Sequence, residues 1–511
     1  MEPRVDRRLL GWVYLAALVL RGVAAARCAS LSPDGVVELD QARAWALGDL
    51  AGGLEPGFSP LLSLLTAALH LLSGLPLEGL ALAGVIAGSA LAAPGAALAA
   101  AWLCPRAPQR AAFAAGLLAA AHPYLVRLGG QVMGYGLAHG LEGLAAGLAV
   151  RAAARGRARD AASAGAVVGL AYLARADALT IAVGLAAGLA WCGRRRLTSV
   201  VAFALAATLV ASPYLLALRA HHGAWRLSGR KTVSQLTHAT PVTLRPPAED
   251  TLRAWVDREA VAADGNPRVT IPVDGFLGAA TFALDKVVGA SVPPLLVLAL
   301  LGCVLAGPRP RPPPLAWALA AFAAGQILLR ANYGYTSRIH ASSAGVLVAP
   351  LAAVAWARAP WRRLAGGRAR LACAATLAAG LVALLPKALD PQQEGRGPQA
   401  AVGAWIAARD QPQEVWGIDA RVVAHYAGAA YRDVPSLTPG QLVDEARAAG
   451  VRWLVVYVRH RAARPEALTP ALAAAGARRV DPGFADRAGA TRYRWLVFEL
   501  PAGPIQGTSS R

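Results

Sequence analysis

The residues best suited to acid–base chemistry are four carboxylates in the stretch LSPDGVVELDQARAWALGDL, residues 31–50. They are Asp34, Glu38, Asp40 and Asp49. A carboxylate held within about 3 Å of a hydroxyl group can remove its proton as a general base. Apolar segments precede and follow this stretch, so both of its ends are predicted to be held by neighbouring hydrophobic segments. A carboxylate needs such support to stay within reach of the proton it removes. General-base chemistry on a hydroxyl is therefore one prediction.

The element that would position these carboxylates is a short helix. Residues 36–48 contain no Pro and no β-branched residue after Val37, which favours a helix there. Asp34 and Glu38 would then share one helix face at i, i+4 spacing. Two interpretations of Asp34 stay open: it catalyses, or it caps the helix while Glu38 lies near the positive helix end. Asp40 and Asp49 are predicted to be solvated.

Composition predicts an α-helical polytopic membrane protein. Of 511 residues, 56% are hydrophobic and 16% are charged, against about 25% charged in soluble domains. Apolar segments of about 20 residues, the length that crosses a bilayer, recur from residue 9 to residue 387 and predict about 11–13 transmembrane helices. The candidate spans are roughly 9–29, 57–75, 79–103, 110–125, 132–150, 161–176, 178–192, 198–218, 286–306, 314–330, 337–356 and 370–387. The first is interpreted as a retained span rather than a signal peptide.

The formal net charge of +21 reflects topology rather than nucleic-acid binding. Much of the excess positive charge lies in clusters between spans, at residues 151–159, 193–196, 307–312 and 358–370. Short basic loops of this kind are cytoplasmic. This rule places loops 30–56 and 219–285 and the C-terminal domain on the external side, in a membrane whose lipid the basic loops contact. The abundance of Ala, Gly, Arg and Pro is typical of a GC-rich bacterial genome, so a bacterial inner membrane is expected. The five cysteines form no CxxC motif, which argues against a zinc or disulfide framework.

After residue 387 the composition changes to that of a small soluble α/β domain. The segments EVWGI, AYRDVP, RWLVVYVR and RYRWLVFEL are typical of strands, and ARVVAHYAGA and TPGQLVDEARAAGV of helices, the second with Thr438 as N-cap. We therefore predict a transmembrane domain at 1–387 and an external domain at 388–511.

Several motifs together resemble a known family. The pair PDGVVELDQARAWALGDL and GFSPLLSLLTAALHLLSG is similar to the start of family 39-type glycosyltransferases, of the dolichyl-phosphate-mannose-protein mannosyltransferase kind. These belong to the membrane-embedded GT-C superfamily. Asp34, Gly35, Ala42, Ala46, Gly48 and Pro60 match its pattern. HPYLVRLGGQVMGYGL, GLAYLARADAL, SPYLLALRAHHGAWRLSGRKTV and NYGYTSRIHASSAGVLVAPLAAVAWA follow in the expected order, so the resemblance covers residues 1–387.

The chain also departs from that pattern. Glu38 stands where relatives carry an aromatic residue, and Gln131 and Tyr135 stand where relatives carry acids in the second external loop. Glu142 lies too far into the following span to replace them. These departures leave open whether a second carboxylate acts in this protein and whether activity is retained.

The resemblance implies a polyprenyl-phosphate-sugar-dependent glycosyltransferase. It would transfer a sugar, with inversion, from a lipid-phosphate donor to an acceptor hydroxyl on a lipid, polysaccharide or protein at the external face. Asp34 would be the catalytic base. Residues that would bind substrate, the arginines by bidentate contact with phosphate, are Glu38, Arg127, Arg175, Asp177, Arg230, Lys231 and Arg338. No metal ligands are predicted, although a divalent cation is left open.

Alternative interpretations accompany these assignments. Arg127 and Arg338 could be interfacial residues whose charged ends reach the water, and Arg175 with Asp177 could be a buried ion pair. For the whole chain, the alternatives are a non-catalytic protein that binds lipid-linked sugar and a transporter or flippase of such lipids. A transporter should show related halves, and no such symmetry is present in the sequence.

Overall fold

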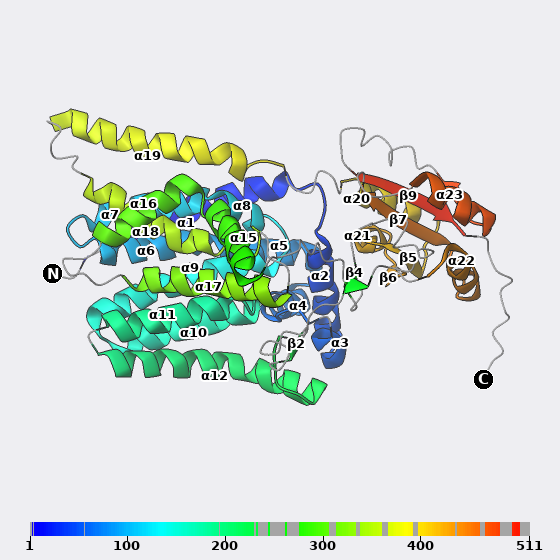
Figure 1. Cartoon of the computed structure of the whole chain (residues 1–511), viewed down its shortest axis with the longest axis horizontal. Coiled ribbons are helices and arrows are strands. Elements are labelled where there is room, and N and C mark those ends of the chain that lie inside the picture. The colour runs from blue at the N-terminus through cyan, green and yellow to red at the C-terminus, as the bar shows by residue number, and fades with distance from the viewer. Residues whose placement is uncertain are drawn as a thin grey trace. The chain divides into compact units, whose positions relative to one another are not determined.

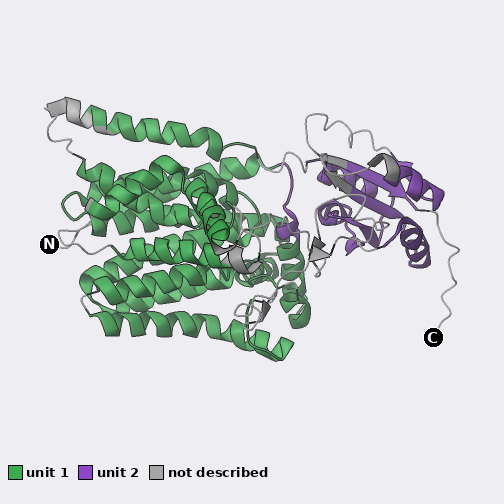
Figure 2. Cartoon of the chain, viewed as in Figure 1, with its two compact units in different colours: residues 1–28, 37–240, 273–391 green, residues 29–36, 241–272, 392–511 purple. Residues whose placement is uncertain are grey.

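The computed structural model describes residues 3–500, apart from gaps at 4, 56, 194, 229–230, 233–243, 246–260, 263–274, 306–312, 334–337, 360–365, 392–396, 435–436, 460–464 and 481–492. The chain divides into two compact units, shown in Figure 2. Unit 1 comprises residues 1–28, 37–240 and 273–391, and unit 2 comprises residues 29–36, 241–272 and 392–511. Helix α2 (Pro33–Ala46) begins in the short segment of unit 2 and continues into unit 1.

Unit 1 is built from apolar helices rich in Ala and Leu, which are strong helix formers (Figure 1). Its helices are α1 (Arg7–Ala26), α3 (Leu50–Leu54), α4 (Leu61–Ser73), α5 (Leu77–Ala90), α6 (Ala92–Leu103), α7 (Pro108–Ala121), α8 (Pro123–Gly129), α9 (Gly134–Arg155), α10 (Ala158–Ala174), α11 (Ala178–Cys192), α12 (Arg196–His222), α15 (Gly275–Ala290), α16 (Pro293–Leu305), α17 (Pro314–Tyr333), α18 (Ala344–Arg358) and α19 (Gly366–Ala388). Two short antiparallel strand pairs follow α12: β1 (Arg226–Ser228) with β2 (Lys231–Thr232) in unit 1, and β3 (Leu244–Arg245) with β4 (Val261–Ala262) in unit 2.

The predicted class, an α-helical membrane protein, is confirmed. Three helical stretches of the described residues are long and apolar enough to cross a membrane: Arg7–Ala26, Leu77–Leu103 and Arg196–His222. Two bent helix pairs raise this number to five if each pair is one span, and five shorter apolar helices accompany them. The predicted short helix in the acidic stretch is also present, as α2.

Two of the predicted spans are bent helix pairs rather than straight helices. At the predicted span 286–306, α15 and α16 meet at 94°. The break lies at Ser291 and Val292, just before Pro293 and Pro294, and Val292 has a φ of 59°. At the predicted span 110–125, α7 and α8 meet at 56°, with the break at His122 before Pro123. Proline disfavours helical geometry in the residue before it, which explains both breaks.

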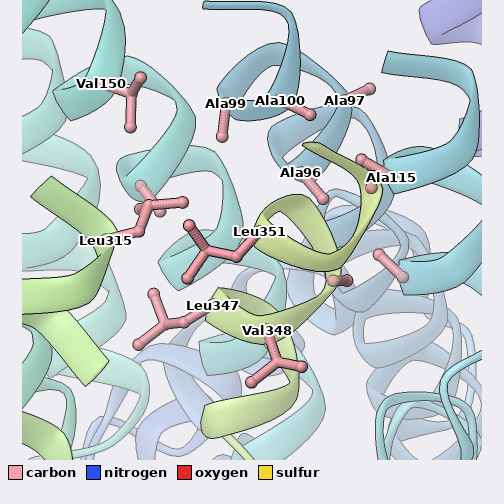
Figure 3. Packing of buried hydrophobic residues seen from close by; sticks show 14 of the residues in the cluster. Ala96, Ala97, Ala99, Ala100, Ala115, Val150, Leu315, Leu347, Val348 and Leu351 are labelled. Carbon is pink, nitrogen blue, oxygen red and sulfur yellow. The ribbon is translucent and has the colours of Figure 1, made fainter. Parts of the chain in front are cut away.

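Small residues allow the helices of unit 1 to pack closely. Figure 3 shows Ala96, Ala97, Ala99 and Ala100 of α6 in the same buried cluster as Leu347 and Leu351 of α18. A Cβ atom at Gly140 of α9 would collide with the carbonyl oxygen of Gly88 in α5. Lipid tails are as apolar as the side chains, so helix association in a membrane depends on this close packing. It fixes the position of α9.

The C-terminal part of unit 2 is a five-stranded mixed sheet in the order β6-β5-β7-β9-β8. The strands are β5 (Glu414–Ile418), β6 (Ala430–Asp433), β7 (Trp453–Arg459), β8 (Arg478–Val480) and β9 (Tyr493–Glu499). β5 pairs in parallel with β6 and β7, whereas β9 is antiparallel to β7 and β8. The four predicted strands are present, and β8 was not predicted.

Helices cover both faces of this sheet. Helices α20 (Gly397–Arg409) and α21 (Arg421–Tyr426) contribute to one buried cluster, and α22 (Pro439–Ala448) and α23 (Pro465–Ala474) to the other. The two predicted helices are α21 and α22, and the Thr438 N-cap is confirmed as a capping box with Gln441. Alternate side chains of β5 point to opposite faces, with Val415 in the first cluster and Trp416 in the second.

Candidate functional site

Asp34 lies in the first turn of α2 but is not the residue that caps it. The Ser32 hydroxyl accepts a hydrogen bond from Gly35 N at 2.9 Å, and the Ser32 carbonyl accepts one from Val36 N at 3.1 Å. This is the arrangement of an N-cap. Among the described residues, none donates a hydrogen bond to the half-buried Asp34 carboxylate. Because Ser32 does the capping, the alternative interpretation of Asp34 as the cap loses its support.

Glu38 follows one turn later and caps a different helix. Its Oε1 atom accepts a hydrogen bond from Gly134 N at 2.9 Å, at the N-terminus of α9. Residue Met133, which precedes α9, supplies no side-chain cap, and the Glu38 side chain is buried. A carboxylate is favourable at the positive end of a helix dipole. Glu38 therefore joins α2 to α9.

The turn between α10 and α11 places Arg175 and Asp177 together. Arg175 Nε lies 3.0 Å from Asp177 Oδ1 and 3.2 Å from Oδ2, and each side chain is 21% exposed. The Arg175 guanidinium carbon lies 3.3 Å from the ring centroid of Tyr135, which is a close cation–π contact. An ion pair and an aromatic ring therefore hold this guanidinium from two directions.

Gly134 is the point where these elements meet. A Cβ atom there would lie 3.2 Å from Glu38 Oε1, 3.8 Å from Arg175 Cγ and 2.8 Å from the carbonyl oxygen of Ala174. Helices α2 and α9 and the α10–α11 turn thus converge around one residue. The structure brings together three of the residues predicted from sequence, Glu38, Arg175 and Asp177.

The other predicted residues lie elsewhere or are not described. Arg127 is half-buried in the last turn of α8, and Arg338 is exposed in the turn before α18. No hydrogen bond or ion pair of the described residues joins either of them to the Gly134 region. Arg230 lies outside the described residues, and Lys231 lies in β2, where its side chain is not described.

A row of polar residues on α9 was not predicted as part of a site. Tyr135, His139 and Glu142 are spaced at i, i+4 and i+7, so they share one helix face. His139 Nε2 lies 3.0 Å from Ser342 Oγ, and the Tyr135 ring lies 6.0 Å from that of His340. The helical spacing of polar residues in an apolar segment was the signal that could have found this row.

Arg21 is a second residue that sequence interpretation missed. It lies in α1 with 0% exposure, and its Nη1 atom donates to Ala17 O at 3.1 Å and to Ala120 O at 3.5 Å. Ala120 lies in the last turn of α7, where the chain bends at His122. A cation is favourable at the C-terminal end of a helix. Arg21 thus stabilises the broken end of α7, and a lone charge in an apolar run was the signal for it.

A divalent cation would need several ligand side chains gathered around one point. Among the described residues, no three His, Cys, Asp or Glu side chains gather in a way that could hold a metal ion. The Glu38 carboxylate accepts a hydrogen bond from Gly134 N, and the Asp177 carboxylate forms an ion pair with Arg175. These two carboxylates, as they are placed, do not fit a metal site.

No protein-family model and no curated protein matches the chain, whereas solved structures do. ArnT from Cupriavidus metallidurans in the apo state is 15% identical with a TM-score of 0.60, and the match covers 97% of this chain and 99% of ArnT. The same protein bound to undecaprenyl phosphate is 16% identical with a TM-score of 0.58 and the same coverage. The oligosaccharyltransferase of Archaeoglobus fulgidus in complex with zinc and sulfate is 14% identical with a TM-score of 0.55, covering 93% of this chain and 72% of that one.

We expect the charge of Glu38 to matter less than its hydrogen bond. Glu38→Gln keeps an oxygen that can accept from Gly134 N, whereas Glu38→Ala leaves this buried N–H without its partner, at a cost of about 1–3 kcal/mol. Thermal unfolding in detergent should therefore show a clear loss of stability for Ala and a small one for Gln. Equal losses for the two variants would contradict the capping role.

The likeness to these solved structures extends along nearly the whole chain, through the helical unit and the C-terminal sheet. At such low identities it is the fold that is shared. The chain therefore has the fold of ArnT and of the oligosaccharyltransferase.

Proposed function

We propose that this protein transfers a sugar from a polyprenyl-phosphate-linked donor to an acceptor hydroxyl at the external face of a bacterial inner membrane. The observation that carries the proposal is the Arg175 guanidinium, held by Asp177 and by the Tyr135 ring inside an apolar helical unit. A charge held among apolar helices in this way is a functional hypothesis by default. Two solved structures that share the fold support it, since one of them holds undecaprenyl phosphate.

The reaction assigns one role to each side chain. The Asp34 carboxylate takes the proton of the acceptor hydroxyl while that oxygen forms a bond to the anomeric carbon of the donor. The bond between the anomeric carbon and the phosphate oxygen breaks, the configuration inverts, and the polyprenyl phosphate leaves with the bonding electrons. Arg175 stabilises the negative charge that develops on this phosphate. Its terminal nitrogens suit a phosphate, while Nε keeps the bond to Asp177.

Glu38 supports this geometry as a positioning residue. By capping α9 it joins α2 to the helix that carries Tyr135. A base must be held within hydrogen-bond reach of its proton, so a rigid helix is a better carrier than a loop. We therefore assign Glu38 to the site through its position rather than through contact with the sugar.

Binding of the lipid carrier tests the proposal directly. We expect the purified protein in detergent to bind undecaprenyl phosphate, seen as an added mass by native mass spectrometry and as a rise in the unfolding temperature. Undecaprenol, which lacks the phosphate, should produce neither effect. Equal binding of both lipids would contradict recognition of the phosphate.

Glycan and lipid profiling of a deletion strain tests the transfer itself. We expect the strain to lack one glycosylated envelope product, and the wild-type gene to restore it. If the protein binds the lipid phosphate but the product does not change, it is a binding protein rather than a transferase.

A further inference from the structure

The C-terminal domain has no role in the reaction described so far, although it shares unit 2 with the segment that leads into α2. Residues 29–36 group with residues 392–511 and not with the helical unit. Ser30, Leu31 and Ser32 of this segment are all buried, with 5–6% of their surface exposed. Asp34, the proposed base, comes directly after them. The entry to the catalytic helix therefore belongs to the same compact unit as the C-terminal domain.

Two contacts fasten this segment within unit 2. Leu31 N donates a hydrogen bond to Tyr426 Oη at 3.4 Å, across 395 positions of sequence. Ala29 lies beside the start of α20, where a Cβ atom at Gly397 would be 3.6 Å from the Ala29 Cβ. Helices α20 and α21, which cover one face of the sheet, thus supply both contacts.

Tyr426 itself is firmly placed. It is the last residue of α21, and α20 packs against it at Gly403. A Cβ atom at Gly403 would lie 2.6 Å from Tyr426 Cβ and 2.5 Å from the carbonyl oxygen of Val423, so no larger residue fits there. The close approach of the two helices leaves the Tyr426 backbone little freedom, and its hydroxyl is a fixed acceptor for Leu31 N.

The bonded residue, Leu31, immediately precedes the N-cap of α2. Ser32 then caps the helix through Gly35 N, and Asp34 occupies the turn that this cap organises. Contacts made by the residue before an N-cap can fix the angle at which the chain enters a helix. A hydrogen bond at Leu31 therefore acts on the orientation of the turn that carries Asp34.

We propose that the C-terminal domain is a positioning element for catalysis, and that Tyr426 holds the first turn of α2 through the Leu31 amide. The role of Asp34 in this proposal rests on the proposed function. Tyr426 touches neither sugar nor phosphate. Its hydroxyl restricts the directions that the Asp34 carboxylate can take, and so keeps the base within reach of the acceptor proton.

The test is Tyr426→Phe in the full-length protein, because phenylalanine keeps the ring and removes only the hydroxyl. We expect kcat for sugar transfer to fall about tenfold, with the KM for the lipid-linked donor unchanged, because orientation of the base is lost while donor binding is kept. Hydrogen–deuterium exchange of the peptide that contains Leu31 should become about tenfold faster, because the amide loses its acceptor.

A matched control is Tyr431→Phe in the same domain. The Tyr431 hydroxyl donates to Asp433 Oδ1 at 3.0 Å and contacts Gly417 O at 3.3 Å, and it does not contact residues 29–36. This variant should leave both kcat and the exchange of the Leu31 peptide at wild-type values.

The outcomes separate this inference from the proposed function. Unchanged exchange in Tyr426→Phe would overturn the contact, and faster exchange with unchanged kcat would overturn the positioning role. An equal loss of activity in Tyr431→Phe would also overturn it, because the effect would then be general weakening of the domain. If the wild-type protein binds lipid phosphate but transfers no sugar, the proposed function fails, while faster exchange would still support the hold on α2.

Discussion

Replacing Asp34 with asparagine is expected to lower the rate of sugar transfer by about 10²–10⁴-fold, the range that a positioned general base contributes. Asparagine has the shape of aspartate and can accept a hydrogen bond, but it cannot take up the hydroxyl proton at neutral pH. Because Ser32 rather than Asp34 caps α2, the helix should keep its stability. The measurement is single-turnover transfer from a polyprenyl-phosphate-linked sugar by the purified variant.

Asp40→Asn on the same helix is the matched control. The Asp40 carboxylate forms an exposed ion pair with Arg43 at 3.0 Å, and such pairs contribute about 1 kcal/mol or less. We expect near wild-type transfer from this variant. Binding of undecaprenyl phosphate should be unchanged in both variants, because neither carboxylate is proposed to hold the phosphate. Wild-type transfer by Asp34→Asn would remove the proposed base and favour a non-catalytic binding protein.

Replacing Arg175 with lysine should have the second largest effect, a fall in transfer of about 10²–10³-fold. Lysine keeps the positive charge but loses the planar fork that can bind a phosphate while remaining bonded to Asp177. It also loses the stacking on Tyr135. We expect weaker binding of undecaprenyl phosphate as well, measured by native mass spectrometry, which would set this variant apart from Asp34→Asn.

The control for Arg175 is Arg151→Lys at the other end of the α9–α10 pair. Arg151 Nη2 donates to Asp160 Oδ1 at 2.7 Å, so this variant also changes a partly buried arginine–aspartate pair. It should transfer sugar at close to the wild-type rate. The double variant Arg175→Gln with Asp177→Asn avoids leaving one charge buried alone, which by itself costs about 3–5 kcal/mol. If the double variant regains wild-type transfer, Arg175 is structural.

Much of the fold could be predicted because its signals are local. The apolar runs that became α5–α6, α11 and α12 are continuous in sequence, and the strand segments of the C-terminal domain have their own hydrophobic pattern. The Thr438 capping box needs only four consecutive residues. Such features depend on propensity and hydropathy within a few turns of the chain.

The breaks in the helices show where hydropathy fails. The segment 286–306 is apolar throughout, so a hydropathy window counts it as one span. The two prolines at 293 and 294 indicate a possible break in the helix. A hydropathy window does not detect such a break, because it measures how apolar a segment is and not the direction of its backbone. Backbone geometry at Ser291 and Val292 turned the chain by 94°.

The candidate site was only partly within reach of the sequence. Arg175 and Asp177 could be found from the sequence because they are charged residues in apolar surroundings. They are also only two positions apart, so their ion pair is local. Glu38 was expected to bind substrate, whereas its carboxylate contacts an amide 96 positions away. Tyr135, noted only as a missing acid, proved to be the ring on which Arg175 stacks.

By itself, then, the sequence determined that this chain is a helical membrane protein with a small α/β domain, and that the acidic stretch forms a helix which starts near Asp34. Tertiary structure decided which partners the polar groups have. Ser32 rather than Asp34 caps α2, Glu38 caps α9, and the Tyr426 hydroxyl accepts a hydrogen bond from Leu31 N. The physical reason is range. Helix and strand formation depend on neighbours along the chain, whereas the partner of a buried polar group is whichever residue close packing brings within about 3 Å.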